Sequence, residues 1–228
     1  MPAPAHIIIA IDGPAASGKS SVARALAKRL GFDYVNTGAM YRAITWFIVL
    51  KGVPVPDTGR VQQLLHFADI RCGLANGEST ILIDGIDPTP HLVSEEVNAN
   101  VSAVSSIAEV RRLLVEKQRV YATHSDVVME GRDIGSVVFP ESDYKFYIDA
   151  SAEVRALRRQ RQGLQDSIAA RDKVDSTRRN SPLTIAEDAH VIDSSNLTIE
   201  GVVGEIIGRL KMKGLEVGHV WARRWEAE

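Results

Sequence analysis

Residues 13–20 read Gly-Pro-Ala-Ala-Ser-Gly-Lys-Ser and match the pattern G-x-x-x-x-G-K-[ST] in full. The segment before them, Ile7–Ile11, is short and continuously apolar, as expected of a strand buried on both faces of a parallel sheet. After them, apolar side chains recur at helical spacing until Gly31. The start of the chain therefore predicts a strand, a glycine-rich loop and a helix, in that order.

The residue types in this loop suit the binding of a phosphate chain. Glycines let backbone N–H groups approach phosphate oxygens closely, and the following helix directs its positive end toward them. Lys19 adds a positive charge for the β- and γ-phosphates, and the hydroxyl of Ser20 is suited to coordinate Mg²⁺. The loop predicts a nucleotide site, but by itself it does not separate a GTPase, an ATPase motor and a small-molecule kinase.

The order of the remaining elements indicates the fold class. The patterns predict a helix from Thr37 to about Leu50, a turn-rich break at 51–60, a hairpin of strands Ile70–Leu74 and Thr80–Ile83, core strands Asp126–Glu130 and Tyr144–Ile148, a last strand His190–Asp193 and a closing helix around 202–210. We expect Ser94 to cap a helix, and Ser106 with Glu109 to form a capping box. Strands that alternate with helices predict an α/β fold, namely a P-loop three-layer α/β/α sandwich with a parallel sheet.

Composition excludes several classes of protein. The chain has 228 residues, of which 45% are apolar and 25% charged, so a disordered or collagen-like chain is ruled out. The formal charge of −2 gives no general attraction for nucleic acid. Cys72 is the single cysteine, the first residues do not resemble a signal peptide, and no apolar stretch is long enough to cross a membrane. We therefore expect a cytoplasmic protein that binds neither nucleic acid nor membrane.

The arginines favour a kinase among the P-loop classes. The Asn-Lys-x-Asp guanine reader of many GTPases is absent, and strand 127–130 ends in a single Glu rather than the Asp-Glu of many motor ATPases. Arginine outnumbers lysine, and Arg42, Arg132 and a cluster at 155–179 adjoin glycines or polar segments rather than apolar stripes. A kinase with a phosphate acceptor must hold two polyanions in line, and the planar guanidinium binds phosphate through two hydrogen bonds.

Five segments, in their order and spacing, resemble a known family. They are Ile11–Ser21, Thr37–Arg42, Gly131–Pro140, Arg171–Arg178 and Ile192–Ile199. Together they resemble bacterial cytidylate kinase, a family of nucleoside monophosphate kinases, over almost the whole chain. The resemblance implies an enzyme of pyrimidine nucleotide metabolism that transfers a phosphoryl group from ATP to CMP or dCMP, with Mg²⁺ as cofactor.

The resemblance also implies the residues that bind each substrate. For ATP these are Gly13, Pro14, Ala15, Ala16, Ser17, Gly18, Lys19, Ser20 and Ser21, with Ser20 on the metal. For CMP they are Thr37, Arg42, Ser102, Arg111, Arg132, Asp133, Arg171, Asp175 and Arg178.

Individual roles follow from the same resemblance. Arg42 is expected on the acceptor phosphate, Arg132 is expected to bind a phosphate, and Asp133 is expected near the cytosine, whose amino group needs an acceptor. Ser102 and Arg111 would help to define the pyrimidine pocket, Arg171 and Asp175 would contact the ribose, and Arg178 the base or phosphate. Lys19, Arg132 and the lid residue Arg158 are the expected catalytic residues, with Arg155, Arg159 and Arg161 as alternatives to Arg158.

The resemblance implies a monomer built from three regions. The P-loop core comprises 1–36, 104–150 and 180–228, the acceptor-binding region with a small β/α insert spans 37–103, and the lid spans 151–179. Two alternatives stay open. One is another small-molecule P-loop kinase, acting on UMP, AMP or dephospho-coenzyme A, and the other is a nucleotide-gated RNA-binding protein that uses the basic segment 155–179.

Overall fold

The computed structural model describes residues 6–161, 168–178 and 181–215 of the chain. The strands are β1 (Ile8–Asp12), β2 (Asp33–Asn36), β3 (Ile70–Ala75), β4 (Glu78–Ile83), β5 (Val127–Gly131), β6 (Tyr144–Asp149) and β7 (His190–Asp193). The α-helices are α1 (Lys19–Leu30), α2 (Thr37–Leu50), α3 (Thr58–Phe67), α4 (Glu95–Val104), α5 (Ala108–Tyr121), α6 (Ala152–Arg161), α7 (Ile168–Thr177) and α8 (Ile199–Met212). A 3₁₀ turn η1 (Thr89–His91) and a π-helical turn η2 (Ile134–Val138) complete the described elements.

The strands form one sheet in the order β3-β4-β2-β5-β1-β6-β7. All neighbouring strands run parallel except β3 and β4, which form the predicted antiparallel hairpin. This hairpin extends the central sheet, because β4 pairs with β2. β1 lies between β5 and β6, so the loops that follow β1 and β5 leave the sheet side by side at its carboxyl edge.

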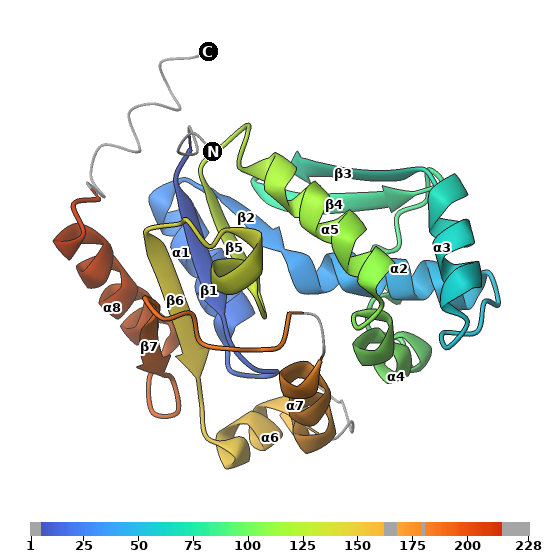
Figure 1. The fold of residues 1–228 in the computed structure, drawn as a ribbon. Coiled ribbons are helices and arrows are strands. Elements are labelled where there is room, and N and C mark those ends of the chain that lie inside the picture. Colours follow the sequence, from blue (N-terminus) through green and yellow to red (C-terminus); the bar gives the residue numbers. More distant parts are fainter. Residues whose placement is uncertain (1–5, 162–167, 179–180, 216–228) are drawn as a thin grey trace.

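Helices cover both faces of the sheet, which confirms the predicted three-layer α/β sandwich (Figure 1). Ile8 and Ala10 of β1 pack in the core beneath α2 and α5, whereas Ile9 and Ile11 pack in the core beneath α1 and α8. Successive side chains of a strand point to opposite faces, so a strand covered on both sides must be apolar throughout. This explains the continuous apolar run that precedes the glycine-rich loop.

Side-chain hydrogen bonds explain where two of the helices begin. The starts of α3 and α5 differ from the prediction. Ser94 caps α4 as predicted, since its side chain accepts a hydrogen bond from the N–H of Val97. The predicted capping box at α5 is wrong, because the hydroxyl of Ser106 donates to the carbonyl of Ser102 instead. The expected break at 51–60 is too long, since Asp57 accepts from the N–H of Arg60 and caps α3.

The segment predicted to be a lid lies at the carboxyl edge of the sheet. Here α6 and α7 pack against each other, and α7 also contacts α4 of the acceptor-binding region (Figure 1). Within the described residues, no helix combines the length and the apolar character needed to cross a membrane.

Ile206→Ala is expected to lower the free energy of unfolding by about 2–5 kcal/mol, because this side chain of α8 is fully buried in the core between α8 and the sheet and its loss leaves a cavity. Ile199 begins the same helix and is 47% exposed, so Ile199→Ala is a matched control. The control should change the free energy by less than about 1 kcal/mol. Urea denaturation measures both values, and equal losses would contradict the packing of α8 on the sheet.

Candidate active site

The predicted phosphate loop joins β1 to α1, and its first glycine has no room for a side chain. Gly13 has φ +153°, and a Cβ atom there would lie 2.1 Å from the carbonyl oxygen of Ile148. Gly18, with φ +91°, lies directly before the first turn of α1, whose unpaired N–H groups face the loop. Residues 15–22 line a cleft of about 610 Å³. A cleft of this size accommodates a nucleotide.

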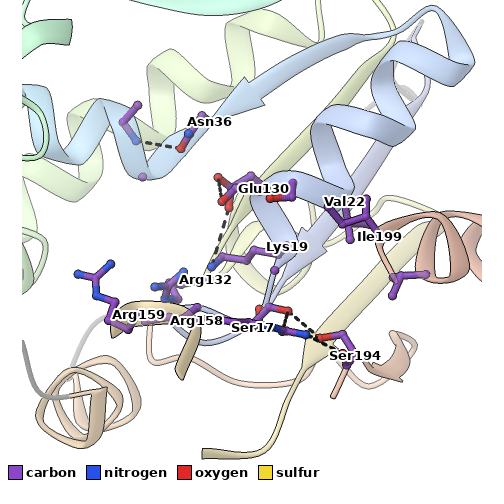
Figure 2. A pocket seen from close by; sticks show the side chains of 18 of the residues that line it. Ser17, Lys19, Val22, Asn36, Glu130, Arg132, Arg158, Arg159, Ser194 and Ile199 are labelled. Atoms are coloured by element: carbon purple, nitrogen blue, oxygen red, sulfur yellow. Dashed lines mark hydrogen bonds and ion pairs between the residues drawn. The ribbon is translucent and has the colours of Figure 1, made fainter. Parts of the chain in front are cut away.

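The carboxylate of Glu130, at the end of β5, faces this loop. Its Oε1 accepts a hydrogen bond from the hydroxyl of Ser20 at 2.9 Å, and its Oε2 lies 4.0 Å from the Nζ of Lys19 (Figure 2). Burial lowers the pKa of Lys19 to about 7; the positive charge of Arg132 adds to this effect, and Glu130 opposes it. The ammonium group therefore lies in a poorly hydrated site, where a phosphate would replace the missing water.

A second, smaller cavity of about 80 Å³ adjoins the cleft at the same edge. Its lining includes Thr37, Tyr41, Ser102, Arg111, Arg132, Asp133, Asp175 and Arg178. Seven of the nine residues predicted to bind CMP therefore line a single cavity. Arg42 lines the larger cleft instead, and the side chain of Arg171 lies outside the described part of the structure.

Asp133 and Arg111 form a buried ion pair in this cavity, with side chains only 6% and 5% exposed. The guanidinium of Arg111 also lies over the ring of Tyr41, 5.5 Å from its centre. A buried carboxylate is tolerated when a charged partner and hydrogen bonds compensate for lost hydration. The arrangement fixes a buried hydrogen-bond acceptor in the lining of the cavity.

Asp175, on α7, lies between two of the cavity's arginines. Its carboxylate accepts from the Nε of Arg132 at 2.8 Å and from the guanidinium of Arg178 at 2.5 Å. Burial opposes the ionisation of Asp175, but the two neighbouring positive charges outweigh it and hold its pKa below the usual range. The arginines are thus oriented and neutralised by an acid of the lid region.

Arg42 is held from two sides. Its guanidinium donates to the side-chain oxygen of Asn98 at 2.7 Å and to the carbonyl of Leu92 at 3.0 Å. Both partners belong to the segment around the start of α4, so this segment orients an arginine of α2 toward the larger cleft.

The arginines of α6 contact the backbone of the phosphate loop. Arg158 donates to the carbonyl of Ser17 at 3.0 Å and to the hydroxyl and carbonyl of Ser194 at 3.1 and 2.8 Å (Figure 2). Arg155 donates to the carbonyl of Ala15 at 3.3 Å. Arg158 and Arg159 both line the larger cleft. The helix α6 of the predicted lid region is therefore hydrogen-bonded to the phosphate loop.

Sequence reasoning missed several polar residues of the site. Glu130 was noted only as the end of a strand, although a carboxylate one residue before the Gly-Arg-Asp segment was a usable signal. Asp12, next to Gly13, and Ser194, after the last strand, were not singled out as site residues. Their neighbours lie far away in the sequence, so no local pattern marked them.

A phosphate loop that opens onto an arginine-lined second cavity is the arrangement of a P-loop kinase, in which two phosphorylated substrates meet. The family model for cytidylate kinase matches residues 9–212, and the chain belongs to this family.

Curated relatives cover nearly the whole chain. The cytidylate kinase of Streptomyces avermitilis is 39% identical over 216 residues, which are 91% of this chain and 94% of that protein. The cytidylate kinase of Caldanaerobacter subterraneus is 44% identical over 209 residues, 87% of this chain and 92% of that protein. The cytidylate kinase of Streptococcus suis is 43% identical over 217 residues, 90% of this chain and 96% of that protein.

Gly13→Ala is expected to abolish ATP binding, because the new methyl group would collide with the Ile148 carbonyl and push the loop away. Gly52 is the matched control, since it also has positive φ (+63°) but no atom within 4 Å of the added Cβ. Gly52→Ala should cost about 1 kcal/mol of stability and leave ATP binding intact. Calorimetric titration with ATP compares the variants, and normal binding by Gly13→Ala would contradict the loop geometry.

Proposed function

We propose that this chain transfers the terminal phosphoryl group of ATP to CMP and dCMP, giving ADP and CDP or dCDP. The observation that carries the proposal is the short path between the two cavities. Glu130, near the end of β5, lies in the phosphate cleft, and three residues later Asp133 lines the arginine-lined cavity. Membership of a family whose relatives are named cytidylate kinase supports the same reaction.

On the ATP side, residues 13–21 would wrap the phosphates with backbone N–H groups, and Lys19 would contact the β- and γ-oxygens. The hydroxyl of Ser20 and the carboxylate of Glu130 are hard oxygen ligands 2.9 Å apart, a donor set that fits Mg²⁺ directly or through water. When bound, Mg²⁺ would neutralise charge on the ATP phosphates. We propose Ser20 as a ligand and Glu130 as its partner.

On the acceptor side, Asp133 would accept a hydrogen bond from the amino group of cytosine, while Arg111 holds its carboxylate in place. Thr37, Ser102 and Arg178 line the same cavity, and Arg42 faces the cleft where the acceptor phosphate would lie. A phosphate acceptor is already an anion, so the reaction depends on alignment and positive charge rather than on a strong base.

Lys19, Arg132 and Arg158 are our candidates for stabilising the transferred phosphoryl group. Arg132 lines both cavities, and Lys19 lines the phosphate cleft. For Arg158 the assignment requires that its bonds to Ser17 and Ser194 be exchanged for phosphate oxygens. Because Arg155 and Arg158 are bound to protein carbonyls, this basic segment gives little support to the alternative of RNA binding.

Entry of the acceptor requires movement of the lid. A cavity of about 80 Å³ is smaller than the roughly 300 Å³ of small-molecule sites. We propose that α7 moves outward with Asp175, releases Arg132 and Arg178, and closes again over the nucleotide. In the closed complex Asp175 would be available to the ribose hydroxyls. Closure would also exclude water and suppress the hydrolysis of ATP.

The proposed function predicts fast ADP release from ATP with CMP and dCMP, and slow release with UMP, AMP and GMP. A coupled assay of ADP release with Mg²⁺ and this acceptor panel measures it. Preference for UMP or AMP would point to a different monophosphate kinase, and ADP release that no acceptor accelerates would contradict the proposal.

Asp133→Asn is expected to lower kcat/KM for CMP by about 10- to 100-fold, because the amide is a weaker acceptor and leaves Arg111 without a charged partner. KM for ATP should stay unchanged, since Asp133 does not line the phosphate cleft. Steady-state kinetics with each substrate varied in turn measures both values. A folded variant with normal CMP kinetics would contradict the role of Asp133 at the base.

A further inference from the structure

Asp12 connects the phosphate loop to the acceptor segment through two hydrogen bonds. It is the last residue of β1, directly before Gly13, and its side chain is buried. Its Oδ1 accepts from the backbone N–H of Ile134 at 2.8 Å, and its Oδ2 accepts from the N–H of Gly135 at 2.8 Å. Both donors belong to the turn η2, which directly follows Asp133.

Burying this carboxylate in the core costs hydration free energy. Burial raises the pKa of Asp12 to about 7, the two amide bonds lower it, and the nearby Asp133 raises it further. A buried charge stabilises a fold only where its hydrogen bonds offset the lost hydration. Here both oxygens are committed to consecutive amides, so one side chain fixes the orientation of the backbone on the acceptor side.

Close contacts fix the position of the turn η2. A Cβ atom on Gly135 would lie 3.1 Å from Cγ of Lys145 and 3.4 Å from Oδ2 of Asp12. Lys145 is itself buried; its ammonium group donates to the carbonyl of Pro140 at 2.5 Å and to Asp188 at 2.9 Å. The segment that follows β5 is thus held by Asp12 at its start and by Lys145 at its end.

We propose that Asp12 is a positioning residue, which sets Arg132 and Asp133 at a fixed distance from the phosphate loop and so aligns the acceptor with ATP. The assignment rests on the proposed function, because it takes Arg132 and Asp133 as contacts of the acceptor nucleotide. Asp12 touches neither substrate in this account. It acts through the backbone of η2 on one side and through its covalent neighbour Gly13 on the other.

Asp12→Asn tests the proposal, since an amide has a single acceptor oxygen and turns an N–H toward one of the two donors. We expect KM for CMP to rise by about tenfold or more, while the Kd of ATP without CMP changes by less than about twofold. We also expect faster hydrogen exchange at the amides of Ile134 and Gly135, with exchange in residues 13–20 unchanged.

Asp126→Asn is the matched control. Asp126 accepts a backbone hydrogen bond from Ile7 at 2.8 Å, at the opposite end of the same two strands. The variant Asp126→Asn should lower the melting temperature without changing KM for CMP. If Asp12→Asn behaves in the same way, with lower stability and normal kinetics, Asp12 has a structural role only and the inference is wrong.

Two further outcomes separate this inference from the proposed function. If the unsubstituted chain shows no CMP-dependent turnover, the proposed function fails, and amide exchange in Asp12→Asn still reports whether the carboxylate orders η2. If Asp12→Asn does not fold, the same measurements are made on Asp12→Ser, whose smaller hydroxyl can accept one bond. Failure of both variants to fold and bind ATP would show that Asp12 supports the whole nucleotide site, which contradicts a specific effect on the acceptor segment.

Discussion

The parallel pairing of β1 with β5 is the constraint on which the site depends. Asp12 at the end of β1 lies opposite Gly131 at the end of β5. The phosphate loop begins one residue after Asp12, and the acceptor segment begins one residue after Gly131. Two polyanions that repel each other in water can thus be bound at adjacent points of one rigid sheet edge, where orientation is fixed before either arrives.

Charge compensation is the second property that the site needs. Groups of the protein hold its cationic side chains: the Pro14 carbonyl holds Lys19, Asn98 holds Arg42, and Asp175 holds Arg132. Each partner orients a side chain at a position that a phosphate or hydroxyl would occupy or adjoin. In the proposed function, binding of a nucleotide would exchange one set of polar contacts for another, and the release of α7 would couple acceptor entry to lid movement.

Local patterns were sufficient to predict the elements that carry the chemistry. The apolar run at Ile7–Ile11, the loop glycines and the helix ending at Gly31 reflect burial and backbone conformation, which a short sequence window records. The hairpin of β3 and β4 was equally readable from its Asn76-Gly77 turn, in which both residues have positive φ. The predicted capping box at α5 does not form, because the hydroxyl of Ser106 donates to the carbonyl of Ser102 instead.

The contacts that join these elements were not predictable in the same way. The bonds from Asp12 to Ile134 and from Glu130 to Ser20 connect residues more than a hundred positions apart. Asp175 was expected at a ribose, and its pairing with Arg132 depends on where the lid helix packs. Such pairings follow from the strand order of the sheet, which a single sequence does not encode in any local window.

Binding of a molecule in which adenosine and cytidine are joined through a chain of phosphates tests the central claim most directly. If the two sites adjoin across Glu130 and Arg132, which line both cavities, one equivalent should bind more tightly than ATP or CMP and should displace both of them. Calorimetric titration with and without each nucleotide measures this. A compound that competes with ATP but leaves CMP binding unchanged would show that the two cavities do not form one site.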